Sequence, residues 1–367
     1  MRYTKRGQRL SSFFVSIFIL ALMGAGLTGP YSIASAAQAK PIELKFAEDE
    51  PAQSLFCQTR FWWAEEIAKR TNGRLKIKIY PASTLANGRN AIDAVRARLA
   101  DGGKAVSVFH PGKTPLSTVS QNPLGSTDLY AGNMAIQDLM FNYKPLIQEW
   151  AKFNQIPLWN SPTGSQNLIA NRPLTDLSQL KGLKIRASAQ NADVVAILGG
   201  TPVFIPMPET YEALQRATAD GAMAGLAHMK PLRFWEVCKH LLMFGNNGIS
   251  ACGFGTLNLD VWKSLPKDAQ KVVLDVSKEF TAYLAERQIE LEKNVLDEFR
   301  TAGVKIYTLN DEDKKAFSAA CETVSRKWAK DLDDKGLPGT EILDLFLKKT
   351  AEYEAEVKAQ GYPWAKK

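Results

Sequence analysis

The chain has 367 residues, of which 45% are hydrophobic and 23% are charged, a composition typical of globular proteins with substantial cores. It contains 46 lysines and arginines against 38 aspartates and glutamates, a net charge of +8. Four of the basic residues and none of the acidic ones precede residue 40, so the remainder carries 42 basic against 38 acidic residues, or +4. That small excess, without a basic cluster interleaved with aromatic residues, argues against a nucleic-acid partner.

The first 39 residues have the three parts of a secretory signal peptide. The four basic residues precede an apolar run from Phe13 to Leu22, and two A-x-A cleavage sequences follow, Ala34-Ser35-Ala36 and Ala37-Gln38-Ala39. The run is shorter than the about 20 residues that a membrane-spanning helix needs. The sequence therefore predicts a signal peptide over residues 1–39 and an exported protein with no stable membrane insertion after cleavage, long enough for two domains.

The first half of the remaining chain alternates between strand and helix patterns. The expected elements are a strand over 42–47, a helix over 53–70, a strand over 74–80, a helix over 91–99 and a strand over 105–109. Such alternation predicts an α/β fold with a mostly parallel sheet and helices on both of its faces.

A second unit begins after residue 159. Its expected elements are strands over 167–170, 182–186, 201–205 and 223–226 and a helix over 192–198, while 254–259 returns to the first sheet. This order predicts two lobes joined by crossing strands around a hinged cleft. Lobe I comprises 40–162 and 250–288, and lobe II comprises 163–249 and 289–367.

One long helix is expected from Ala269 to Ala302. Apolar residues form two stripes along it, separated by a polar break at Arg287 and Gln288. At 1.5 Å per residue the helix would span roughly 50 Å, too long for one lobe, so it is expected to bridge both. The alternative is two helices with an unmarked joint. The segment 311–367 is expected to be helical, with a break at Pro338-Gly339.

Four cysteines would enter an oxidising compartment, and their pairing is open: Cys57, Cys238, Cys252 and Cys321. Cys238 and Cys252 flank two apolar runs joined by a glycine- and asparagine-rich turn, so a disulfide across that turn is one possibility. Buried free thiols are the other. The spacings do not fit a metal site.

Two segments resemble a known family. The first, from Gly182 to Leu226, reads GLKIRASAQNADVVAILGGTPVFIPMPETYEALQRATADGAMAGL, and the second, from Gly73 to Val95, reads GRLKIKIYPASTLANGRNAIDAV. Both are similar to the DctP-type solute-binding proteins of tripartite ATP-independent periplasmic (TRAP) transporters. The resemblance covers essentially the whole exported chain, and it implies a two-lobed periplasmic binding protein fold with a hinged cleft and a long bridging helix.

Arg186 is the principal candidate for binding a ligand. The resemblance implies that it holds the carboxylate of an organic acid. Independently, Arg186 ends a strand in which Leu183 and Ile185 alternate with polar residues, and ligands of α/β proteins bind beyond the carboxyl ends of strands. A guanidinium matches a carboxylate with two parallel hydrogen bonds. A surface arginine paired with a nearby acid is the structural alternative.

Two further positions are interpreted through the same resemblance. Gln166 stands where several sialic-acid-type relatives carry a second arginine, and Ala224 stands where many relatives carry an asparagine that binds the ligand. Both residues lack the polar contact of those relatives. The sequence therefore predicts a ligand less hydroxylated than a sugar acid.

Five more residues are candidates for the cleft. Met223, Trp159 and Trp235 would make the pocket apolar, although ordinary core packing is the alternative for all three. Phe109 ends one expected strand of the first lobe, Glu48 follows another, and both are expected to face the cleft. Together these residues predict a monocarboxylate with an apolar or aromatic body.

Enzyme motifs fail at specific positions. Gly112-Lys113-Thr114 lacks the earlier glycine of a P-loop, whose position is held by Ser107, and Cys252 breaks the nucleophile-elbow pattern that begins at Gly248. We therefore expect no catalytic residue, metal or cofactor. The predicted function is a periplasmic receptor that delivers an organic acid to a TRAP membrane permease. Alternatives are a receptor that presents ligand to a sensor, or a secreted enzyme using the same cleft.

Overall fold

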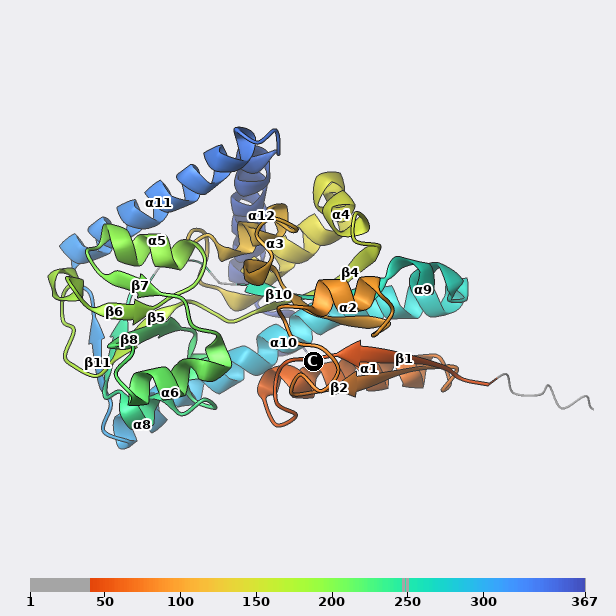
Figure 1. Cartoon of the computed structure of the whole chain (residues 1–367), viewed down its shortest axis with the longest axis horizontal. Helices are drawn as coiled ribbons and strands as arrows, with labels where there is room; N and C mark the ends of the chain where they lie inside the picture. The colour runs from red at the N-terminus through yellow and green to blue at the C-terminus, as the bar shows by residue number, and fades with distance from the viewer. Residues whose placement is uncertain (1–39, 246–247, 249–250, 367) are drawn as a thin grey trace, which may run out of the picture. The chain divides into compact units, whose positions relative to one another are not determined.

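A computed structural model describes residues 40–245, 248 and 251–366 (Figure 1). The expected signal peptide lies outside the described residues. Within them, no helix has both the length and the apolar character needed to cross a membrane. The described chain contains two sheets with helices packed on them, which confirms the α/β, two-lobed architecture.

The first sheet forms lobe I and has five strands. Their spatial order is β2 (Leu75–Tyr80), β1 (Ile42–Ala47), β3 (Gly102–Val106), β10 (Ala251–Asn258) and β4 (Gln155–Pro162). β1 is parallel to β2 and β3, whereas β10 is antiparallel to β3 and β4. The helices α1 (Leu55–Arg70), α2 (Ala91–Arg96) and α9 (Leu259–Ser264) belong to this lobe. In α1, the hydroxyl of the N-cap Ser54 accepts a hydrogen bond from the Cys57 amide, which fixes where the helix begins.

The second sheet forms lobe II and has six strands. Their spatial order is β11 (Lys305–Thr308), β9 (His240–Met243), β5 (Asn167–Ala170), β8 (Gly221–Ala224), β6 (Lys184–Arg186) and β7 (Thr201–Val203). Its helices are α5 (Gln190–Ile197), α6 (Thr210–Gln215), α7 (Leu226–Met229), α8 (Phe234–Val237) and α11 (Asp311–Asp333).

The expectation of a mostly parallel sheet is confirmed in both lobes, with one difference: each sheet contains one strand that runs against its other strands. β5 is antiparallel to β8 and β9, just as β10 is antiparallel to its neighbours. These strands receive the chain from the other lobe rather than from a crossover helix, so nothing constrains them to run parallel. A second difference is at 105–109, where β3 ends at Val106 and residues 107–109 form a single 3₁₀ turn.

The possible disulfide between Cys238 and Cys252 depended on the two neighbouring apolar runs forming a hairpin. β9 pairs in the second sheet and β10 in the first, so the two runs do not form a hairpin. Cys57, Cys238 and Cys321 are buried free thiols, and burial raises the pKa of each to about 12. The side chain of Cys252 lies outside the described residues.

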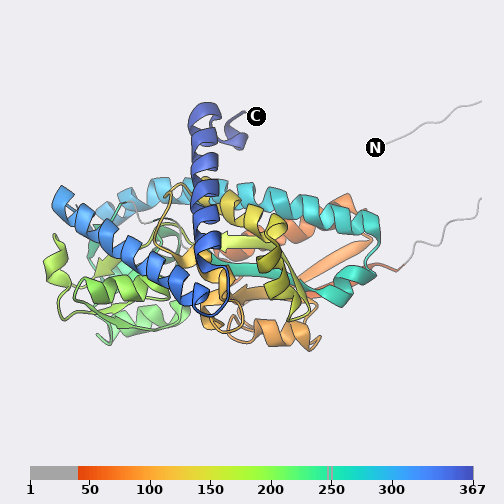
Figure 2. The same cartoon turned by 90° about the horizontal axis from the view of Figure 1, so that it is seen from above.

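The long helix α10 runs unbroken over Lys267–Thr301, 35 residues, and bridges the two lobes (Figure 2). Phe280 and Leu284 pack into the core of the first lobe, and Val295 and Phe299 pack into the core of the second. Gln288, at the expected polar break, is fully buried, and its Nε2 donates to the carbonyl of Pro162 at 2.9 Å. The polar residue that interrupts the apolar stripes therefore bonds to the end of β4, and the helix continues through it without a joint.

Two helices of lobe I, α3 (Leu129–Asn142) and α4 (Lys144–Ala151), were not expected from the sequence. α3 lies against the last helix, α12 (Gly339–Gln360). Ile342 and Phe346 of α12 are buried in the same core as Phe254 of β10. Packing thus places α12 beside the first sheet, whereas its sequence position had assigned it to lobe II.

Candidate ligand-binding site

A cavity of about 310 Å³ is lined by residues of both sheets and their loops. Lobe I contributes the loops after β1 and β3, and lobe II contributes the end of β6 and the turn at Met207–Glu209. Loops after strand ends are where α/β proteins commonly hold ligands, and this volume suits a small molecule.

Arg186 is the last residue of β6, is only 4% exposed and lines the cavity. Its Nε donates to the carbonyl of Ile205 at 2.9 Å, and its Nη1 donates to the carbonyl of Met223 at 3.0 Å. These two bonds hold the plane of the guanidinium in a fixed orientation. A guanidinium fixed at the wall of the cavity is well suited to a carboxylate, which it can bind with two parallel hydrogen bonds.

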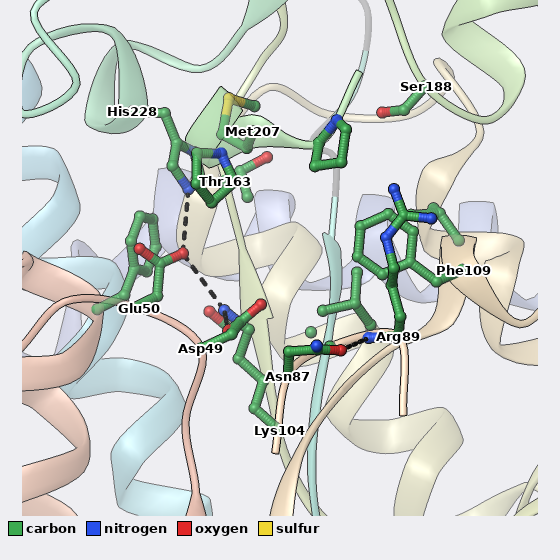
Figure 3. A pocket seen from close by; sticks show the side chains of 18 of the residues that line it. Asp49, Glu50, Asn87, Arg89, Lys104, Phe109, Thr163, Ser188, Met207 and His228 are labelled. Carbon is green, nitrogen blue, oxygen red and sulfur yellow. Dashed lines mark hydrogen bonds and ion pairs between the residues drawn. The ribbon is translucent and has the colours of Figure 1, made fainter. Parts of the chain in front are cut away.

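A group of charged side chains lines the cavity from lobe I (Figure 3). Asp49 and Glu50 follow β1, and Lys104 projects from β3. The Nζ of Lys104 lies 2.7 Å from Asp49 Oδ1 and 3.3 Å from Glu50 Oε1. Burial opposes the charge on Lys104, but the neighbouring carboxylates outweigh it and raise the pKa of Lys104 well above its usual value. Burial likewise opposes the charge of Glu50, yet Lys104 and His228 hold the pKa of Glu50 below its usual value.

Glu48, which was expected to face the cleft, is fully buried and does not line the cavity. Its Oε2 pairs with the Nε of Arg60 at 3.1 Å, and its Oε1 lies 3.4 Å from Lys104. Burial raises the pKa of Glu48 to about 7 against the opposing effect of these two cations. Glu48 therefore supports the charged group from within the core, and its neighbours Asp49 and Glu50 reach the cavity instead.

His228 of α7 brings the second lobe to the same group. Its ring stacks on Phe56 with 4.7 Å between centroids, and its Nε2 lies 3.5 Å from Glu50 Oε1. Figure 3 shows His228, Glu50, Asp49 and Lys104 gathered on one side of the cavity. The described residues contain no cluster able to hold a metal ion, and the ammonium of Lys104 lies among the carboxylates.

Arg89 and Phe109 lie on the other side of the cavity (Figure 3). The guanidinium of Arg89 is 4.9 Å from the centroid of the Phe109 ring and 5.9 Å from that of Phe204. Phe109 belongs to lobe I and Phe204 follows β7 of lobe II, and their rings meet edge to face at 6.0 Å. The lobes therefore touch through aromatic rings at this edge of the cavity.

Of the residues proposed from the sequence, Arg186, Gln166 and Phe109 line the cavity. The Nε2 of Gln166 donates to the hydroxyl of Thr163 and to the carbonyl of Gly164, each at 3.1 Å. These bonds fix the amide where the chain passes from β4 to β5.

The other sequence candidates are core residues. Trp159 is fully buried between Trp63 and Phe280, and Ala224 is fully buried in the second lobe. Met223 is 1% exposed, and only its backbone carbonyl contributes to the site, by accepting the hydrogen bond from Arg186. Trp235 packs in the core of the second lobe. The expectation that they line the cavity is wrong, because each side chain points to the packed face of its element.

The cavity has polar side chains beside apolar ones such as Phe56, Val106 and Met207. Sequence reasoning missed a set of cavity residues that share charge or hydrogen-bonding capacity: Asp49, Glu50, Asn87, Arg89, Lys104 and His228. For Asp49 and Glu50 the signal was present, since they directly follow the strand 42–47. For His228 and Lys104 it was not, because only the three-dimensional arrangement brings them to the same carboxylates.

The family model described as bacterial extracellular solute-binding protein, family 7 (DctP) matches residues 46–331. Among curated proteins, the chain is 25% identical over 257 residues to a 2,3-diketo-L-gulonate-binding periplasmic protein of Escherichia coli, covering 69% of this chain and 76% of that one. It is 27% identical over 264 residues to a monocarboxylate 2-oxoacid-binding periplasmic protein of Nostoc sp., covering 69% and 70%.

Solved structures show the same fold. A TRAP periplasmic solute-binding protein from Desulfovibrio salexigens is 29% identical, with a TM-score of 0.75 and coverage of 87% of this chain and 97% of that one. A TRAP solute-binding protein from Rhodoferax ferrireducens, in complex with copurified benzoate, is 21% identical, with a TM-score of 0.79 and coverage of 86% and 99%.

Proposed function

The chain belongs to the DctP family of bacterial extracellular solute-binding proteins, the solute receptors of TRAP transporters, and on that premise we propose that it captures a small organic acid in the periplasm and delivers it to a membrane permease. The family consists of solute receptors rather than enzymes. Structures with this fold hold benzoate, orotic acid and pyroglutamate, all of which are carboxylic acids. These ligands support a carboxylate as the ligand here.

The guanidinium of Arg186 carries the proposal. It is buried, lines the cavity, and is oriented by the carbonyls of Ile205 and Met223. A carboxylate that enters the cavity replaces its water shell with charge-assisted hydrogen bonds to this group. Closure of the two lobes around the bound acid then presents a compact receptor to the permease.

The test begins with the ligand itself. Native mass spectrometry of the purified protein identifies any small acid that copurifies, and calorimetry with that acid and with a panel of carboxylates measures affinity. Binding of at least one carboxylate at the cavity is the expected result. Binding only of uncharged solutes would refute the proposal.

Substitutions at Arg186 test the site. Arg186→Ala removes the charge and should abolish detectable binding, whereas Arg186→Lys keeps the charge, loses the planar fork and should weaken binding by about 1.5–3 kcal/mol. The matched control is Arg172→Ala, since Arg172 is exposed and lies 3.9 Å from Asp220 on the surface of the same lobe. Wild-type affinity in Arg186→Ala would remove this residue from the site.

A further inference from the structure

The carboxylates of Asp49 and Glu50 face the cavity without being fully buried. Their side chains are 20% and 18% exposed, whereas that of Lys104 is 8% exposed. All three line the cavity. More of the two acidic side chains than of Lys104 is therefore accessible from the cavity.

The cations of the group are already occupied by its own acids. The ammonium of Lys104 has three donors and lies within 3.4 Å of carboxylate oxygens from Glu48, Asp49 and Glu50. The guanidinium of Arg60 is fully buried, pairs with Glu48 at 3.1 Å and donates to Ser161 Oγ at 2.6 Å. Neither cation offers a ready partner to an incoming anion.

His228, which belongs to lobe II, restricts the conformations of the Glu50 side chain. Its ring is stacked on Phe56, and its Nε2 lies 3.5 Å from Glu50 Oε1. With Lys104 at 3.3 Å from the same oxygen, the carboxylate of Glu50 is held in place. A fixed carboxylate is a directional hydrogen-bond acceptor, because its lone pairs point to defined positions.

We propose that Glu50, assisted by Asp49, determines specificity by accepting a hydrogen bond from a hydroxyl or N–H group of the ligand. This inference rests on the proposed function, in which Arg186 binds the ligand carboxylate. An acid with a donor at the opposite end satisfies Glu50, a purely apolar acid leaves it unpaired, and a dicarboxylate brings a second negative charge against it. The receptor thus selects hydroxy or amide monocarboxylates, a more polar class than the sequence predicts.

Two matched sets of acids test the inference on the wild-type protein. The first is benzoate, 3-hydroxybenzoate and isophthalate, and the second is butyrate, 3-hydroxybutyrate and succinate. Members of a set are similar in size and differ in the group remote from the first carboxylate. In calorimetric titrations, at least one hydroxy acid should bind about tenfold or more tighter than its unsubstituted partner, and its dicarboxylate should bind most weakly of the three.

Glu50→Gln removes the charge and keeps the shape. In this variant the hydroxy acid should lose most of its advantage, and the dicarboxylate should gain about tenfold in affinity. Asp49→Asn should have the same two effects, a weaker preference for the hydroxy acid and tighter binding of the dicarboxylate, but each should be smaller than in Glu50→Gln. The control is Glu279→Gln, because Glu279 is exposed and pairs with Arg70 at 2.6 Å outside the cavity. Thermal unfolding of each variant verifies that it is folded.

The outcomes separate the two proposals. If no carboxylate of either set or copurified acid binds the wild-type protein, the proposed function fails and the inference with it. If carboxylates bind but dicarboxylates match or exceed the hydroxy acids, only the role of Glu50 is overturned. Loss of that dicarboxylate binding in Arg89→Ala would then assign the second carboxylate to Arg89, which lies across the cavity (Figure 3).

Discussion

Two arginines on α1 pair with glutamates in opposite environments. Arg60 and Glu48 are both fully buried, with 3.1 Å between Nε and Oε2, whereas Arg70 and Glu279 are 34% and 50% exposed, with 2.6 Å between Nη2 and Oε2. The shorter pair is the weaker contributor to folding, because water screens exposed charges. For the buried pair, the loss of Arg60 removes the nearer of the two cations that offset the charge of the fully buried Glu48, the other being Lys104 at 3.4 Å.

Arg60→Leu should therefore lower the free energy of unfolding by about 3–5 kcal/mol. Arg60 also contacts the face of Trp159, with 4.7 Å from its Cζ to the ring centroid, so the leucine retains only part of the packing. Arg70→Ala is the matched comparison and should cost at most about 1 kcal/mol. Urea unfolding of both variants measures the difference, and equal losses would contradict the assigned burial.

Glu292 predicts a dependence of stability on pH. It is half-buried on α10 beside Gly164, and burial raises its pKa from 4.5 to about 7. The carboxyl group of Glu292 therefore binds its proton more tightly in the folded protein than in the unfolded chain. The stabilisation from this protonated carboxyl group is complete below about pH 4.5 and is lost as the pH rises through 7.

Glu292→Gln cannot ionise, so it should raise the melting temperature relative to wild type at pH 8 and change it little at pH 5. The control on the same helix is Glu290→Gln, since Glu290 is 63% exposed and pairs with Arg287. Scanning calorimetry at both pH values checks the prediction. A Glu292→Gln effect that is the same at pH 5 and pH 8 would show that the carboxyl is not desolvated in the folded protein.

Single residues show where sequence reasoning succeeds and where it stops. Arg186 was identifiable because the sequence around it resembles the DctP-type pattern, and the cavity does include it. Trp159 and Met223 are equally conspicuous in the sequence but point into packed cores. A one-residue change of register exchanges the two faces of a strand, so periodicity alone does not decide which face meets a ligand.

At the scale of elements, the contact between β10 and β4 depends on a glycine. Gly255 pairs with Trp159 across the two strands, and the indole of Trp159 covers the glycine Cα. A Cβ at position 255 would lie 2.0 Å from Trp159 Cε2. The tryptophan, packed against Phe46 and Phe280, has no space into which to move.

Gly255→Ala should destabilise the protein by about 1–3 kcal/mol or more through overpacking. Gly112→Ala is the control, because a Cβ at that position meets nothing within 4 Å. Denaturant unfolding measures both. If Gly255→Ala were as stable as Gly112→Ala, β10 and β4 would have to be separated enough to admit the methyl group.

Elements with one buried face were predictable from their periodicity, and others were not. β1 occupies the expected residues 42–47, and α10 differs from its expected bounds by two residues at its start and one at its end. α3 was missed because most of its surface is buried, so it lacks the polar face that marks an amphipathic helix. The expectation that 254–259 returns to the first sheet is confirmed by β10, whereas the sheet that β9 joins was not predicted, since pairing depends on distant segments.

At the scale of the whole molecule, the lobes are connected by the segment 163–166, which contributes Thr163 and Gln166 to the cavity, and by α10 (Figure 2). They also touch through side chains, with Phe109 meeting Phe204 and Glu50 lying near His228. The backbone connections persist in any arrangement of the lobes. A ligand that bridges the lobes should favour the arrangement in which these side chains touch over any more open one.

Ligand should therefore reduce the radius of gyration. We expect small-angle scattering to show a smaller radius when a carboxylate identified by calorimetry is present at saturation. Phe204→Ala removes a contact between the lobes without altering Arg186, so it should weaken binding by populating the open form. The control is Arg186→Ala with the same acid, which should give no change. An unchanged wild-type profile would contradict hinge closure.

The position of α12 has a consequence for how the chain reaches its native state. The core of lobe I joins Ile92 and Phe254 to Ile342, Leu343 and Phe346. A nascent chain cannot complete that core until residues near 346 have been synthesised and are free to pack. Contacts between such distant segments make folding slow. Truncation before residue 339 should accordingly leave a chain that collapses without acquiring a cooperative unfolding transition, even though every cavity-lining residue is still present.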